Sequence, residues 1–119
     1  YAVMHEIVHA YVSVINKDVD LWLTEGMALY LSNGEPFYKE YLEYYTIPTY
    51  DIINSNNPLT FSHSGGYTFA HTYIEYLDKT YGWDEVLRLI ASEDYEQCLK
   101  KSKKEVYEEW VQYIENYYQ

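Results

Sequence analysis

The sequence predicts a mainly α-helical fold. Apolar residues recur at helical spacing along most of the chain, and helix caps and breakers such as Asn33-Gly34 and Gly82 separate these segments. No stretch shows a convincing alternation of apolar and polar residues, which would be typical of a half-buried strand. With 119 residues, 48% of them hydrophobic, the chain is long enough for one compact domain, spanning residues 1–119.

Two helices are predicted in the first 31 residues. From residue 1 to about residue 15, apolar residues cover most of the helical circumference, which is typical of a buried helix. Residues 16–20 form a loop rich in Asn and Asp. The second helix runs from about Leu21 to Leu31, and Gly26 inside it indicates close approach to a neighbouring segment.

A third helix and a long irregular segment follow. Pro36 is suited to the first turn of a helix, which the spacing of apolar residues extends to about Tyr45. Residues 46–66 are the least regular part of the chain, with Pro48 and Pro58 among several breakers. Because long loops in compact domains are often functional, this segment is a candidate for part of a site.

Apolar spacing and caps predict four more helices in the C-terminal half of the chain. One covers Tyr67 to Tyr81, with Gly82 as its cap, and the next covers Trp83 to Ala91. A short helix capped by Ser92 ends near residue 101. The capping box Ser102-Lys-Lys-Glu105 then begins the last helix, which carries Trp110 on its apolar face.

Charge and cysteine content exclude some classes of partner. The formal net charge is −11, from 8 basic and 19 acidic side chains, which argues against nucleic acid or an anionic membrane surface as a partner. No apolar run approaches the roughly 20 residues that a membrane span requires. Cys98 is the single cysteine, so no internal disulfide is possible, and we expect a buried structural thiol.

The chain begins with Tyr1, and the pattern of the first helix is already under way at Val3. We therefore expect that upstream sequence has been removed, and targeting signals with it. Compartment and oligomeric state stay open.

The stretch His5-Glu-Ile-Val-His9 predicts a metal site. On a helix, residues four apart lie on one face, about 40° apart and about 6 Å along the axis, so both imidazoles can bind one ion. Glu6 flanks that face as a candidate general base. A catalytic zinc usually has three protein ligands, and Glu25 on the next helix is the candidate third, since an unpaired carboxylate among apolar neighbours is costly.

A ligating histidine usually donates its second ring N–H to an acceptor. Asp18 and Asp20, in the loop between the two helices, could each accept that hydrogen bond. The alternative for both is an ordinary solvated turn.

At these residues the chain resembles the gluzincin metallopeptidases, in which the two histidines of HExxH and a distal glutamate hold zinc. The segment Trp22-Leu-Thr-Glu25-Gly-Met-Ala-Leu-Tyr30 is similar to the Trp-Leu-x-Glu-Gly-x-Ala signature of the aminopeptidase N family, whose glutamate usually comes a few residues later. The chain therefore looks peptidase MA-like. The resemblance implies the helical C-terminal part of a zincin-like domain, with the usual upstream β-sheet subdomain absent from this chain.

The segment from Gly66 to Leu77 is similar to the helix on which that family places its catalytic tyrosine. The resemblance implies that Tyr67 donates a hydrogen bond to the developing oxyanion, while the alternative is an ordinary helix residue. His63 and His71 could each act as a second electrophile, or each could be structural or solvated.

The expected function is therefore that of a zinc-dependent peptidase with one Zn²⁺ per chain. His5, His9 and Glu25 would hold the ion, and Glu6 would activate water against a bond of a peptide or protein substrate. Exopeptidase and endopeptidase activity are both open. One alternative is a non-catalytic zinc-binding module with a regulatory or interaction role, against which the intact Glu6 counts. Another alternative is a metal-free helical scaffold.

Overall fold

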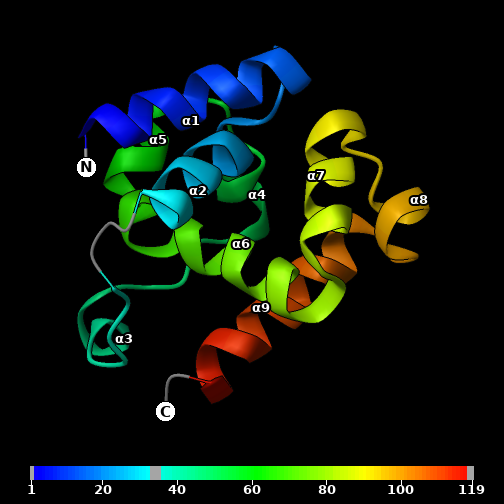
Figure 1. The fold of residues 1–119 in the computed structure, drawn as a ribbon. Coiled ribbons are helices and arrows are strands. Elements are labelled where there is room, and N and C mark those ends of the chain that lie inside the picture. The colour runs from blue at the N-terminus through cyan, green and yellow to red at the C-terminus, as the bar shows by residue number, and fades with distance from the viewer. Residues whose placement is uncertain (1, 33–35, 118–119) are drawn as a thin grey trace.

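Helices dominate the computed structural model, which describes residues 2–32 and 36–117; within these ranges there is no strand. The predicted mainly α fold class is confirmed. In chain order the helices are α1 (Ala2–Ile15), α2 (Leu21–Leu31), α3 (Tyr41–Tyr44), α4 (Tyr50–Ile53), α5 (Pro58–His63), α6 (Gly66–Tyr81), α7 (Trp83–Ser92), α8 (Tyr95–Leu99) and α9 (Lys103–Tyr117) (Figure 1). None of the helices described combines the length and hydropathy that a membrane span requires.

Helix α2 lies between α1 and α6 and packs tightly against α6 (Figure 1). The contact is close because Gly26 has no side chain: a Cβ at this position would lie 2.8 Å from the carbonyl oxygen of Ala70 and 2.9 Å from Cγ1 of Ile74. The close approach predicted from Gly26 is therefore confirmed. It holds the turn of α2 that carries Glu25 beside the first half of α6.

Aromatic side chains form the centre of the core. The ring of Trp22 on α2 meets the rings of Phe61, Tyr73 and Trp110 edge to face, at centroid distances of 5.6–6.0 Å. Trp110 is fully buried, and its indole N–H donates to Thr72 Oγ1 at 3.0 Å. Edge-to-face packing suits the charge distribution of aromatic rings, so this cluster joins α2, α5, α6 and α9.

The C-terminal helix begins as predicted. Ser102 Oγ accepts a hydrogen bond from the Glu105 N–H, and the Glu105 carboxylate accepts one from the Ser102 N–H. This reciprocal pair is the capping box. The short helix before it differs from the prediction, because Asp94, which accepts a hydrogen bond from the Gln97 N–H, caps α8, and Ser92 is the last residue of α7.

The middle of the chain differs most from the prediction. The third helix expected from Pro36 to Tyr45 is wrong, because only α3, four residues long, is helical there. Conversely, the segment expected to be irregular contains α4 and α5, capped by the side chains of Thr49 and Asn57. Short helices of this kind depend on local caps more than on apolar periodicity. The predicted stop at residues 33 and 34 lies outside the described residues.

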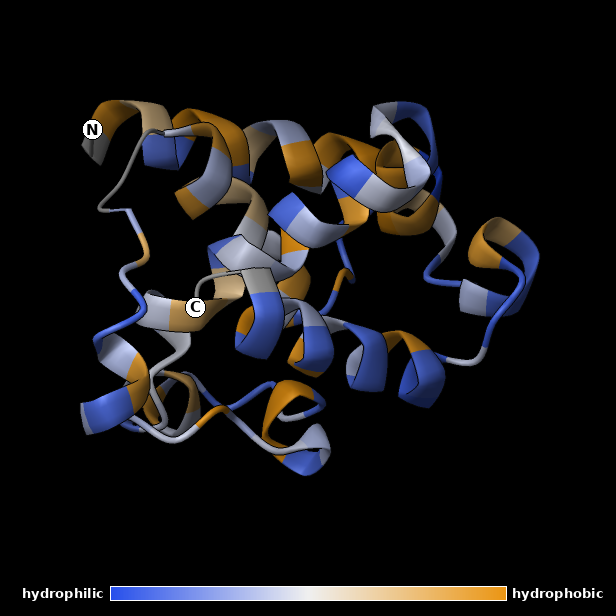
Figure 2. Cartoon of the chain, turned by 90° about the horizontal axis from the view of Figure 1, so that it is seen from below, coloured by the Kyte–Doolittle hydropathy of each residue, from blue (hydrophilic) through white to orange (hydrophobic). Residues whose placement is uncertain are grey.

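Helix α1 is also not the buried helix that its composition predicts. Val8 and Val12 are buried, while Val3, Met4, Ile7, Tyr11 and Val14 are exposed. Among the described helices, α2 and α7 pack against α1, and both cover the same side (Figure 1). Hydrophobic residues nevertheless lie along the whole length of α1 (Figure 2).

Cys98, expected to be buried, is half-buried, with Sγ 3.5 Å from Ser92 Oγ.

Candidate metal centre

The packing of α1 on α2 aims both histidines of α1 at α2. At 100° per residue, Val8, Val12, His5 and His9 fall on one continuous side of the helix. Because Val8 and Val12 are buried, this is the side that faces the core. His5 and His9 are therefore held in the interface with α2, opposite the turn that carries Glu25.

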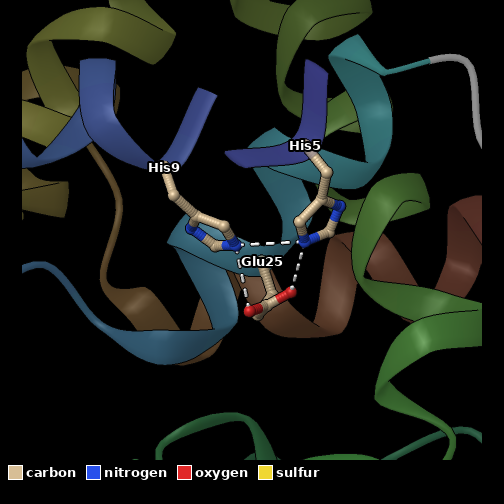
Figure 3. A group of neighbouring side chains, drawn as sticks. All are labelled: His5, His9 and Glu25. Atoms are coloured by element: carbon tan, nitrogen blue, oxygen red, sulfur yellow. Dashed lines mark hydrogen bonds and ion pairs between the residues drawn. The ribbon is translucent and has the colours of Figure 1, made fainter. Parts of the chain in front are cut away.

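Three side chains converge at this interface (Figure 3). Nε2 of His5 and Nε2 of His9 are 3.1 Å apart. The two oxygens of the Glu25 carboxylate lie 3.2 Å from Nε2 of His5 and 3.1 Å from Nε2 of His9. The structure thus brings together the three ligands predicted from the sequence, and their donor atoms all lie within 4.8 Å of one another.

The three side chains lie close enough to bind one zinc ion. Zinc binds nitrogen and carboxylate oxygen at about 2.0–2.2 Å, so the edges of a tetrahedral site measure about 3.3–3.6 Å. The two Nε2 atoms, 3.1 Å apart, fall just short of that length; the contacts to Glu25 go to its two different oxygens, so binding through a single oxygen requires a rotation of the carboxylate. Two imidazole nitrogens with one carboxylate form a donor set that zinc uses in catalytic sites. His5, His9 and Glu25 therefore fit zinc by both spacing and chemistry.

The electrostatics of Glu25 also favour a cation. The side chain of Glu25 is only 14% exposed, and its Oε2 is buried without an accepted hydrogen bond, although His5 Nε2 lies 3.2 Å away. A buried carboxylate oxygen without a donor is costly. The two Nε2 atoms also face each other, and two N–H groups cannot both donate across that gap. A metal ion would satisfy all three groups at once.

Thr24 orients His9, a contact that the sequence prediction missed. Nδ1 of His9 lies 2.9 Å from Thr24 Oγ1, a hydrogen bond that leaves Nε2 with its lone pair when Nδ1 is the donor. For His9, the acceptor is therefore Thr24, and neither Asp18 nor Asp20, the two candidates from the sequence. Asp20 instead accepts a hydrogen bond from Lys103 Nζ at 3.0 Å, and Asp18 is exposed. The signal for Thr24 was its position directly before Glu25, which places it in the same helical turn.

We expect Thr24→Val to lower zinc affinity about 10–100-fold, the usual cost of losing the hydrogen-bond partner of a ligating histidine. Valine keeps the shape of threonine but cannot fix the tautomer of His9. Competition with a chromophoric chelator measures the change. Thr80→Val, an exposed position on α6, is the matched control. Equal zinc affinity in the two variants would show that the Thr24 hydroxyl does not assist the ligand.

Glu6 lies on α1 beside the histidine side, and its side chain is exposed. It borders a shallow hollow of about 460 Å³ that is otherwise lined by Val3, Ile7 and Ala10. At 100° per residue, the residues of this hollow fall on the side of α1 away from Val8 and Val12, so the structure leaves Glu6 accessible to solvent at the edge of the side that bears the histidines.

The structure does not place Tyr67, His63 or His71 among the three converging donors. Tyr67 is in the first turn of α6, is 54% exposed, and its ring meets Phe61 edge to face at 4.9 Å. His63 ends α5 and is exposed. His71 packs against the ring of Phe37, and burial lowers its pKa despite the opposing charge of Glu75.

Comparison of the chain with protein-family models, with curated proteins and with solved structures finds no match.

Proposed function

We propose that this chain carries the zinc-binding and catalytic residues of a peptidase. The observation that supports this most strongly is the convergence of Nε2 of His5, Nε2 of His9 and the Glu25 carboxylate at separations of 3.1–3.2 Å. Three protein ligands are typical of catalytic zinc sites, whereas structural sites usually have four. Among the described residues, the cluster contains these three potential ligands.

His5, His9 and Glu25 would hold the ion. When bound, zinc supplies Lewis acidity, which lowers the pKa of water toward about 7 and polarises a carbonyl group. Side chains of the protein would then carry out the proton transfers. The hydrogen bond between His9 and Thr24 would keep the ligand in the tautomer that donates its lone pair.

Glu6 would act as the general base. It is exposed and directly follows His5, so it can take a proton from the attacking water and later pass that proton to the leaving amine. Tyr67, if its exposed ring turns toward the ion, would donate a hydrogen bond to the oxyanion.

Zinc binding and cleavage of peptides test this proposal together. The purified chain is expected to retain about one zinc per molecule by elemental analysis, and to cleave members of a peptide library. Removing zinc with a chelator should stop cleavage, and adding zinc back should restore it. Zinc without cleavage would favour the non-catalytic zinc-binding module instead. A chain that binds no zinc would contradict both and favour a metal-free scaffold.

A further inference from the structure

The side of α1 that faces away from the core is apolar and exposed. At 100° per residue, six apolar residues fall within about 120° of one another on that side. Five of them are large side chains with 47–87% of their surface exposed, whereas none of the other described helices has more than one exposed large hydrophobic side chain. We call these six residues the α1 outer face: Val3, Met4, Ile7, Ala10, Tyr11 and Val14.

The α1 outer face lies on the opposite side of the helix from the metal centre. His5 and His9 are both about 160° around the helix from the middle of this face. Figure 1 shows α1 along one edge of the molecule, with α2 and α7, which pack against it, on the inner side. A partner bound to the α1 outer face would leave the three ligands in place, so this inference does not rest on the proposed function.

The α1 outer face carries no charge. Glu6, at its edge, is the one Asp, Glu, Lys or Arg side chain between Ala2 and Ile15, although the whole chain has 8 basic and 19 acidic side chains. A basic partner would therefore find a single carboxylate here. Two copies of the chain repel each other, but at physiological salt charges carried elsewhere are screened over about 8 Å. The surface thus suits an apolar partner.

The spacing of the α1 outer face makes it complementary to itself. Its central residues follow one another at intervals of four, three and four, which is the spacing of a coiled-coil seam: Val3, Ile7, Ala10 and Val14. When a second α1 runs antiparallel at the same level, Val3 lies opposite Val14 of the second copy. Bulky Ile7 then lies opposite small Ala10, and such alternation lets facing side chains interdigitate.

The residues that flank this seam also favour an antiparallel pair. Met4 and Tyr11 lie on one flank, and Glu6 and Ser13 lie on the other. An antiparallel twofold arrangement places each flank against the same flank of the second copy. Sulfur then meets an aromatic ring, and the Ser13 hydroxyl can donate to Glu6. A parallel pair would instead place Glu6 against the apolar flank.

The area of the α1 outer face suits a reversible dimer. Scaled by their exposed fractions, the five large side chains present on the order of 400 Å² of apolar surface. This area matches the largest patch of a typical monomer, about 300–600 Å², which is often functional. Two copies would bury on the order of 800–1,000 Å², below the roughly 1,200 Å² of a stable complex and within the range of weak, transient ones.

We propose that the α1 outer face is the contact surface of a reversible homodimer in which two α1 helices pack antiparallel about a twofold axis. A twofold contact of this kind pairs the same surface on both copies. Glu6 stays at the rim of the contact, on the side that bears the histidines, and rims of interfaces remain accessible to solvent.

Light scattering at increasing protein concentration, without added zinc, measures the dimer. We expect a Kd on the order of 10–100 µM, because the contact area is small. Raising NaCl from about 20 mM to about 500 mM should lower this Kd severalfold, since salt screens the repulsion between two chains of net charge −11. A chain that stays monomeric at about 1 mM, or that associates more weakly in high salt, would overturn the proposal.

Ile7→Lys should raise the Kd at least about 100-fold, because it places a charge in the apolar seam. Position 7 is exposed, so circular dichroism should show unchanged helix content. If helix content falls, Ala10→Lys replaces it, since position 10 is exposed and lysine is a good helix former. The matched control is Tyr44→Lys, exposed on α3, which Figure 1 shows far from α1. An unchanged Kd in the folded seam variant, or an equal loss in the control, would contradict the dimer.

Disulfide formation tests the direction of the helices. Chains with Val3→Cys are mixed with chains with Val14→Cys, both in a Cys98→Ser background, and oxidised with glutathione disulfide. The antiparallel pair should link the two different chains, because like positions lie eleven residues from one another and are too far apart for a disulfide. Links mainly between two Val14→Cys chains would show a parallel pair and overturn the arrangement.

Vesicles of uncharged phosphatidylcholine test a lipid surface as the other occupant of the α1 outer face. The chain is expected to stay unbound when the vesicles are floated through a density gradient. Flotation of monomeric chain that Ile7→Lys abolishes would assign this face to lipid and overturn the homodimer.

Discussion

Glu6→Gln is expected to lower kcat for peptide cleavage about 10²–10⁴-fold, the usual contribution of a general base, while zinc stays bound. Glutamine has nearly the shape of glutamate but cannot take the proton from water. Glu6 is exposed and is not among the three converging ligands, so the change should leave zinc content and stability as they are. Steady-state kinetics on a cleaved peptide, combined with elemental analysis, measure both effects.

Glu108→Gln is the matched control, because Glu108 is an exposed glutamate on α9 and gives the same loss of charge. It should cleave like the parent chain. Full activity in Glu6→Gln with zinc retained would rule out Glu6 as the base. A loss of zinc in Glu6→Gln would instead mean that Glu6 supports the metal site, and the kinetic result would then carry no information on proton transfer.

Glu25→Ala is expected to remove most of the stabilisation that zinc gives. A ligand present at 100 times its Kd stabilises the folded state by about 2.7 kcal/mol, and losing one of three protein ligands weakens binding enough to abolish most of that gain. Without zinc, the variant should be about as stable as the parent chain, because removing the buried Oε2, which accepts no hydrogen bond, offsets the loss of the 3.1 Å contact between Oε1 and His9 Nε2. Thermal unfolding at pH 8, with and without zinc, measures both quantities.

Of these two measurements, the stability of Glu25→Ala without zinc distinguishes more clearly between a metal site and an ion-pair cluster. If the three side chains formed a simple ion-pair cluster instead of a metal site, removing the carboxylate would destabilise the chain without zinc, and zinc would shift the parent and the variant equally. Glu108→Ala, exposed on α9, controls for the loss of one negative charge. A normal zinc response in Glu25→Ala would remove Glu25 from the ligand set.

Local patterns predicted the features that depend on a few neighbouring residues. The capping box at Ser102 and Glu105 forms as expected, because both hydrogen bonds lie within four residues. The pairing of His5 with His9 likewise follows from helix geometry alone. The prediction of a third helix failed because the apolar residues after Pro36 have helical spacing, while only Tyr41–Tyr44 are helical. Isolated helices that short gain little from propensity and depend on the contacts around them.

The sequence by itself determined the mainly α fold class and proposed the three ligands, since helical period, caps and the HExxH spacing are encoded locally. Only the tertiary structure decided which side of α1 is covered, and that Thr24 and not an aspartate orients His9. The physical reason is the same in each case. A helical pattern shows which residues share a face, but the packing of distant segments decides what that face contacts.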